Sequence, residues 1–89
     1  MDKEKRVLMM PNVTKGITTA QYRRICESFL AYGCSLCTVA ESADFAGVCL
    51  PVQPEDRLRE CALACVLGGD GSMIHAAHRL LGLAIPLLG

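Results

Sequence analysis

The sequence predicts an α/β fold in which helices cover a parallel β-sheet. Four apolar runs of strand length are separated by segments with helical spacing or helix-start signals. Glycine or proline punctuates the ends of these segments. Near-continuous apolar runs favour strands that are buried on both faces, as parallel strands are. The 89 residues are therefore expected to form a single small domain.

The first strand is expected over Val7–Met10, and Pro11-Asn12 ends it with a turn signal. A helix should follow a loop, with Thr18 or Thr19 as its N-cap and Gly33 as its left-handed stop. One face of this helix is expected to be apolar, because its nonpolar residues recur at spacings of three and one: Tyr22, Ile25, Cys26, Phe29 and Leu30.

A second strand is predicted over 34–39, and an irregular connection over 41–54 with a short strand or turn near Val48–Leu50. Pro54 and two acidic residues indicate one or two helical turns before a central strand at about 62–67. A second long helix is expected from Ser72, with Gly82 as its stop and a fourth strand after it. Its buried side chains are predicted to be Met73 or Ile74, Ala77, Leu80 and Leu81.

The turn between the central strand and this helix has the composition of an anion site. Gly68, Gly69 and Gly71 allow tight backbone bends and close approach of a phosphate. The free N–H groups of the following helix would point at that ligand, and the helix dipole favours negative charge there. Parallel sheets bind ligands at the carboxyl ends of their strands, where this turn is expected to lie.

Asp70 stands inside this glycine turn, where a carboxylate would repel a bound phosphate. Its presence has a chemical reason if it holds a metal that bridges phosphates or accepts a proton from a hydroxyl. A purely structural alternative is that Asp70 caps the helix. The residues of the turn leave these alternatives open.

The segment resembles the N-terminal part of the NAD kinase family. The resemblance rests on Gly68-Gly69-Asp70-Gly71-Ser72 after Ala64–Leu67, on the pair Ala76-Ala77, and on Ile85–Gly89 in register beyond them. It implies a Rossmann-like layer formed by residues 1–89, a truncated N-terminal nucleotide-binding domain. The family's β-rich C-terminal domain is then missing, and with it an Asn-Glu motif that grips NAD.

The resemblance implies transfer of the terminal phosphoryl group of ATP to the 2′-hydroxyl of the adenosine ribose of NAD. Asp70 would be the catalytic proton acceptor, and the nucleotide-binding residues would be Gly68, Gly69, Gly71, Ser72 and His75. Mg²⁺ would accompany ATP, and the full-length protein would be a homo-oligomer. The alternative for His75 is an exposed helix residue, which is also the interpretation of His78.

Two other functions compete with the kinase hypothesis. A non-catalytic remnant could bind a nucleotide or pair with a full-length kinase subunit, using strand edges that the missing domain leaves open. A kinase acting on a lipid or sugar is less consistent with the sequence. Lipid kinases that share the glycine turn usually continue with Asn-Glu-Val-type residues, and Met73–Ala77 departs from that pattern.

Composition argues against several other partners. The formal net charge is zero and there are four aromatic residues, so neither a basic surface nor a stacking platform for nucleic acid is expected. The first ten residues do not form a signal peptide, and no apolar stretch is long enough for a membrane span. A cytoplasmic location is expected.

Six cysteines raise the question of a metal or disulfide framework. Cys34 with Cys37, and Cys61 with Cys65, could supply four thiolates to zinc, although the second spacing is loose. Buried thiols that act as small apolar side chains explain the same residues more simply, and no metal site is predicted.

Overall fold

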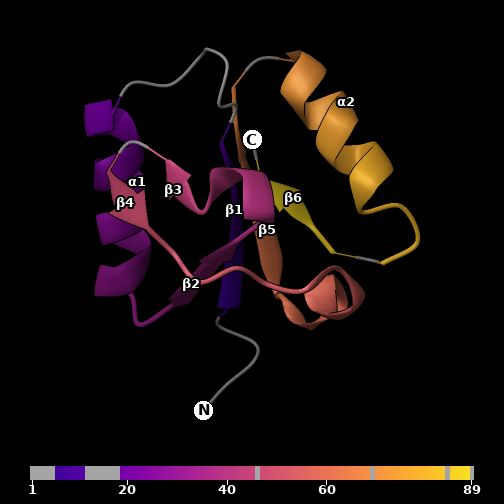
Figure 1. Ribbon diagram of the computed structural model, residues 1–89, viewed down its shortest axis with the longest axis horizontal. Helices are drawn as coiled ribbons and strands as arrows, with labels where there is room; N and C mark the ends of the chain where they lie inside the picture. Colours follow the sequence, from indigo (N-terminus) through magenta and orange to yellow (C-terminus); the bar gives the residue numbers. More distant parts are fainter. Residues whose placement is uncertain (1–5, 12–18, 46, 69, 84, 89) are drawn as a thin grey trace.

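The computed structural model describes residues 6–11, 19–45, 47–68, 70–83 and 85–88, and only the backbone of Asp70. Four parallel strands form one sheet in the order β2-β1-β5-β6 (Figure 1). Their bounds are β1 Arg6–Pro11, β2 Ser35–Thr38, β5 Leu63–Leu67 and β6 Leu87–Leu88. The predicted α/β class and parallel sheet are confirmed. The fourth strand occupies only the end of the segment after Gly82.

The two long helices, α1 (Thr19–Ala31) and α2 (Asp70–Arg79), lie on opposite faces of this sheet (Figure 1). On one face, Val7 and Met9 of β1 belong to the same apolar cluster as Tyr22 of α1. On the other face, Leu8 and Met10 share a cluster with α2 residues. Alternate residues of β1 therefore enter two different cores, as the period-two geometry of a strand requires. Helices on both faces of a parallel sheet make this a Rossmann-like layer.

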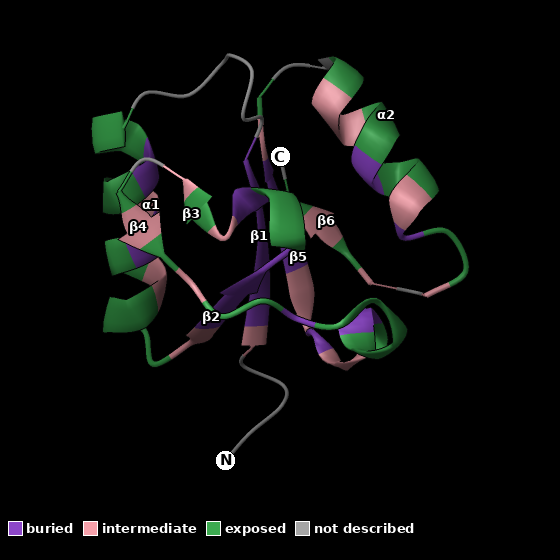
Figure 2. Ribbon diagram, viewed as in Figure 1, coloured by how far each residue is buried: buried purple, intermediate pink, exposed green. Residues whose placement is uncertain are grey.

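β1 is the most buried strand of the sheet, as Figure 2 shows. Its four central residues, Val7–Met10, are at most 8% exposed, which confirms the expected burial on both faces. β2 and β5 flank it, and Pro11 of β1 is in register with Leu67 of β5. The carboxyl ends of the two central strands therefore lie side by side.

The connection between β2 and β5 consists of short elements: η2 (Ala40–Ser42), the hairpin strands β3 (Asp44–Phe45) and β4 (Val48–Cys49), and η3 (Glu55–Glu60). The short strand or turn predicted near Val48–Leu50 is the strand β4, one half of this hairpin, and the helical turns predicted after Pro54 form a 3-10 helix. Val52 pairs with Thr38 and covers the outer edge of β2. Thr38 is fully buried, and its hydroxyl donates a hydrogen bond of 2.7 Å to the Met9 carbonyl.

The end of α1 follows the sequence prediction closely. Gly33 adopts φ +83°, and its N–H donates to the Leu30 carbonyl. The next N–H, from Cys34, donates to the Phe29 carbonyl, which completes a Schellman motif. The predicted apolar face of α1 included Leu30, but the Leu30 side chain is 55% exposed.

The buried face of α2 agrees with the prediction at Met73 and Leu80 and differs from it at Ala77 and Leu81. Ala76 and Leu80 are buried, and Met73 and Leu83 pack against the same cluster. Ala77 is exposed, and Leu81 is 80% and Ile74 62% exposed. The sequence offered two nearly equivalent apolar stripes about 100° apart on this helix, and periodicity alone could not choose between them.

Candidate functional site

The glycine turn lies between β5 and α2, as predicted. Gly68 follows the last residue of β5 and has φ +143°, a backbone conformation that favours glycine. α2 begins at Asp70, two residues before the predicted start. Asp70 and Gly71 therefore belong to the first helical turn, where backbone N–H groups have no partner within the helix.

This turn lies at a topological switch point of the sheet. The chain leaves β1 toward α1 on one face and leaves β5 toward α2 on the other (Figure 1). The two strands are adjacent, and their partners β2 and β6 lie on opposite sides of them. In open parallel sheets, ligands bind at the carboxyl edge where the strand order reverses. The sequence motif and this position therefore coincide.

The structure places several predicted site residues on accessible surface. Gly68 and Gly71 are exposed, and a Cβ built on Gly71 would meet no heavy atom within 4 Å. Ser72 is half-buried, and His75 is exposed one turn further along α2. Gly69 and the side chain of Asp70 lie outside the described residues. The catalytic role of Asp70 and the binding roles of the other five residues stay predictions.

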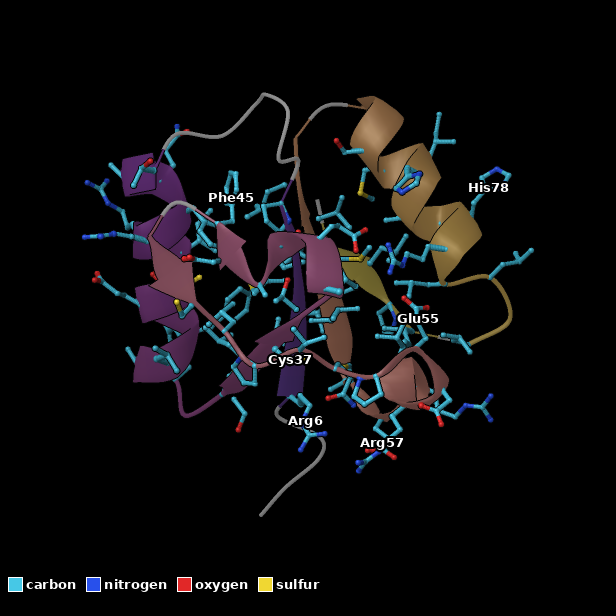
Figure 3. The ribbon with its side chains drawn as sticks, viewed as in Figure 1. Arg6, Cys37, Phe45, Glu55, Arg57 and His78 are labelled. Atoms are coloured by element: carbon cyan, nitrogen blue, oxygen red, sulfur yellow. The ribbon has the colours of Figure 1, made fainter. Side chains whose placement is uncertain are left out.

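The two histidines of α2 differ in what lies near them. A charge on His75 is close enough to help lower the pKa of the Glu41 carboxyl. His78, three residues later, points outward from α2 (Figure 3). His75 therefore lies on the side of α2 that approaches η2, whereas His78 faces away.

Arg79, at the end of α2, joins three elements. Its guanidinium donates hydrogen bonds to the carboxylates of Glu41 in η2 and Glu55 in η3. The Arg79 side chain is 21% exposed, and the hydrogen bond from Arg79 holds the pKa of Glu41 below its ordinary value. This ion-pair cluster anchors the carboxyl-terminal half of α2 and so positions the helix that begins at the glycine turn.

Sequence reasoning did not identify this cluster. Arg79 is separated from its two partners by 38 and 24 residues along the chain. The only local signal was a basic residue in the last turn of a helix, which the helix dipole explains without any partner. The ion pairs of Arg79 form only because the connection between β2 and β5 brings Glu41 and Glu55 close to the end of α2.

The four cysteines considered for zinc do not converge. Cys37 and Cys61 belong to the apolar cluster under α2, whereas Cys65 belongs to the cluster under α1 and Cys34 packs against it. Within the described ranges, no three His, Cys, Asp or Glu side chains are grouped as metal ligands. Buried thiols in two separate cores describe these residues, apart from half-buried Cys34.

The first turn of a helix can stabilise an anion through its backbone N–H groups, and at Gly71 no heavy atom lies within 4 Å of where a Cβ would stand. In the described parts of the chain, no helix is long and apolar enough to cross a membrane.

Comparison with known proteins finds one short similarity. A curated NAD kinase from Nitratidesulfovibrio vulgaris (strain DSM 19637 / Miyazaki F) is 61% identical over 31 residues. The matched segment covers 35% of this chain and 11% of that relative. No family model matches the chain, and no solved structure matches it. The similarity supports a local relationship to NAD kinases.

Proposed function

We propose that this chain is the N-terminal nucleotide-binding domain of an NAD kinase. The proposal rests on one observation: the glycine-rich motif lies at the edge of the sheet where parallel sheets bind ligands. Gly-Gly-Asp-Gly-Ser occupies the junction of β5 and α2, at the carboxyl edge where the sheet reverses its winding. The short match to a curated NAD kinase supports the same assignment. The full-length enzyme would be a homo-oligomer.

The first turn of α2 would bind the phosphates of the nucleotides. The backbone N–H groups at the start of a helix, together with the positive end of the helix dipole, attract an anion without any charged side chain. Gly71 would let the dinucleotide approach the backbone, because no neighbouring atom fills the space where a Cβ would stand. Gly68 and Gly69 would shape the turn, and Ser72 and His75 would supply polar contacts from successive turns of the helix.

Asp70 would act on the acceptor hydroxyl. The 2′-oxygen of the NAD ribose forms a bond to the terminal phosphorus of ATP, and the bond from that phosphorus to the departing ADP oxygen breaks. The 2′-hydroxyl proton passes to the Asp70 carboxylate. Phosphoryl transfer depends chiefly on positioning and on charge stabilisation. A rigid helix start suits that requirement.

Mg²⁺ would enter as a complex with ATP, where it neutralises phosphate charge. The described residues offer no cluster of ligands for a dedicated metal site. The steps assigned to this chain use its backbone N–H groups, the Asp70 carboxylate, and polar contacts from Ser72 and His75.

Nucleotide binding by the 89-residue chain, and turnover by a complete enzyme that contains it, test the proposal. Calorimetry on the chain should detect binding of Mg·ATP and of NAD. The complete enzyme should form NADP when both are present, whereas the isolated chain is expected to be inactive because the C-terminal domain would complete the site. Asp70→Asn should retain nucleotide binding and lose at least 100-fold in rate, because general-base catalysis contributes about that factor. Nucleotide binding without NADP formation by the complete enzyme would favour the non-catalytic remnant instead, and absence of binding to either nucleotide would refute the site.

The histidines of α2 provide a matched pair for the same assay. His75→Ala should weaken ATP or NAD binding, since the exposed His75 lies one turn along α2 from the glycine turn. His78→Ala should leave binding unchanged, since that side chain points outward from the same helix (Figure 3). Equal effects of the two substitutions would remove His75 from the proposed site.

A further inference from the structure

Two buried thiols meet on the α2 face of the sheet, far from the glycine turn. The Sγ atoms of Cys37 and Cys61 are 3.4 Å apart, and the two residues are 3% and 5% exposed. Cys37 belongs to β2, and Cys61 lies between η3 and β5. Cys37 and Arg6 lie toward the lower end of the molecule in Figure 3, whereas α2 begins at the top.

We propose that Cys37 and Cys61 are an oxidisable dithiol that peroxide converts into an intramolecular disulfide. A disulfide bond is about 2.05 Å long, so the two sulfur atoms must approach by only about 1.4 Å. Each lies on an element held by backbone hydrogen bonds, at the Leu8–Cys37 register of the sheet and at the Ala62 N–H bond to the Arg6 carbonyl. The pair is therefore held in place before any oxidant arrives.

The surroundings assign different roles to the two thiols. The hydrogen bond between them raises the pKa of Cys37 and lowers that of Cys61, so Cys61 is the thiol that ionises first. Positive charge on Arg6 also favours the Cys61 thiolate. The single Cys37 S–H proton has two acceptors within reach, the Cys61 sulfur at 3.4 Å and the Val7 carbonyl oxygen at 3.6 Å. Because the thiolate is the nucleophile, Cys61 attacks and Cys37 resolves.

The chemistry balances as a two-electron oxidation. The Cys61 thiolate attacks one peroxide oxygen, an S–O bond forms and the O–O bond breaks, and water leaves after protonation. The Cys37 sulfur then attacks the sulfenic acid at Cys61. An S–S bond forms, the S–O bond breaks, and the departing hydroxide takes the Cys37 proton to become a second water. A dithiol reductant reverses the bond by exchange.

The other cysteines are less suited to this reaction. Burial raises the pKa of Cys65 to about 11, which keeps that thiol protonated near neutral pH. The exposed Cys49 thiol donates a hydrogen bond to the Asp44 carboxylate, and this contact raises its pKa. Among the six cysteines, Cys37 and Cys61 are therefore the pair in which the two sulfur atoms are in contact and one thiol, that of Cys61, has a lowered pKa.

The disulfide would tie β2 to the segment that enters β5, across β1. Such a cross-link restrains the unfolded chain over a 24-residue separation and should raise the thermal unfolding midpoint. It would form away from the carboxyl edge of the sheet, so nucleotide binding at the glycine turn is not required for it.

The test is to treat the intact, reduced chain with hydrogen peroxide, alkylate it under denaturing conditions and map the peptides by mass spectrometry. The number of free thiols should fall from six to four, and dithiothreitol should restore it. The double substitution Cys34→Ala with Cys65→Ala makes the assignment unambiguous. It leaves Cys37 as the only cysteine in peptide 28–41 and Cys61 as the only one in peptide 61–79 after cleavage at Arg and Glu.

In Cys37→Ser, dimedone should trap a sulfenic acid at Cys61, whereas Cys49→Ser should form the cross-link as the unsubstituted chain does. Retention of six free thiols, or a link that joins any other pair of cysteines, would overturn the proposal. The mapping of the unsubstituted chain decides the question even where a substituted chain does not fold.

Discussion

Gly71 shows how much a single position at the site can reveal. It lies in the first turn of α2, is exposed, and has open space where a side chain would begin. The protein itself therefore does not require glycine here. A ligand that approaches the backbone would supply the missing reason for it.

Gly71→Ala should keep or slightly raise the free energy of unfolding, because alanine is the better helix former by up to about 1 kcal/mol. Nucleotide binding should weaken about tenfold or more, since the new methyl group would occupy the ligand's place. Urea unfolding and calorimetry on the same sample measure the two effects. As a control, Ala77→Gly on the exposed side of α2 should cost about 0.5–1 kcal/mol of stability and leave binding intact. Unchanged affinity in Gly71→Ala would place the ligand elsewhere.

At this scale the sequence predicted the residues of the glycine turn and their place at the start of a helix. It could not predict the neighbours of His75 and Arg79. Those neighbours come from the connection after β2, which has no periodic pattern, and its path depends on packing between distant segments.

Among the elements, α2 combines a predicted start with an unpredicted orientation. Apolar residues occur on two sides of this helix, and the sheet accepts the side that carries Met73, Ala76 and Leu80. Arg79 then reaches η2 and η3, which lie on the same face of the sheet. The two ion pairs of Arg79 therefore hold α2 in place together with the apolar packing of its buried side.

Arg79→Ala should lower the free energy of unfolding by about 1 kcal/mol, because two partly exposed ion pairs and the packing of the side-chain stem are lost. Arg59→Ala is the matched control, since this exposed arginine makes no ion pair within the described part of the chain. It should change stability by less than about 0.5 kcal/mol. Equal effects in urea titrations would show that the Arg79 cluster does not hold α2 in place.

For the whole molecule, the winding of the chain determines where the candidate site lies. α1 lies between β1 and β2 in the chain, α2 lies between β5 and β6, and these two halves of the fold meet where β1 pairs with β5. The same winding brings Glu41 from the connection between the halves to Arg79 in the second half. Stability of the folded chain should therefore depend on the ionisation of this carboxylate.

The hydrogen bond from Arg79 lowers the pKa of Glu41 in the folded state. Its stabilising contribution is therefore complete above the ordinary glutamate pKa of about 4.3 and is lost as the pH falls through the lower folded value. Glu41→Gln should cost about 0.5 kcal/mol at neutral pH, a small figure because the side chain is 51% exposed and screened by solvent. Urea unfolding at about pH 7 and pH 3 should show this difference shrinking toward zero at acid pH. A difference that is the same at both pH values would contradict the assignment.

The sequence by itself determined the α/β class, the buried first strand, the stop of α1 at Gly33 and the position of the glycine turn between strand and helix. These features depend on local periodicity, on turn-forming residues and on helix caps, which act over a few residues. The tertiary structure alone decided which stripe of α2 is buried, the Arg79 cluster, and the meeting of Cys37 with Cys61. Each of these contacts joins segments that are distant in sequence, and the order in which strands assemble brings them together.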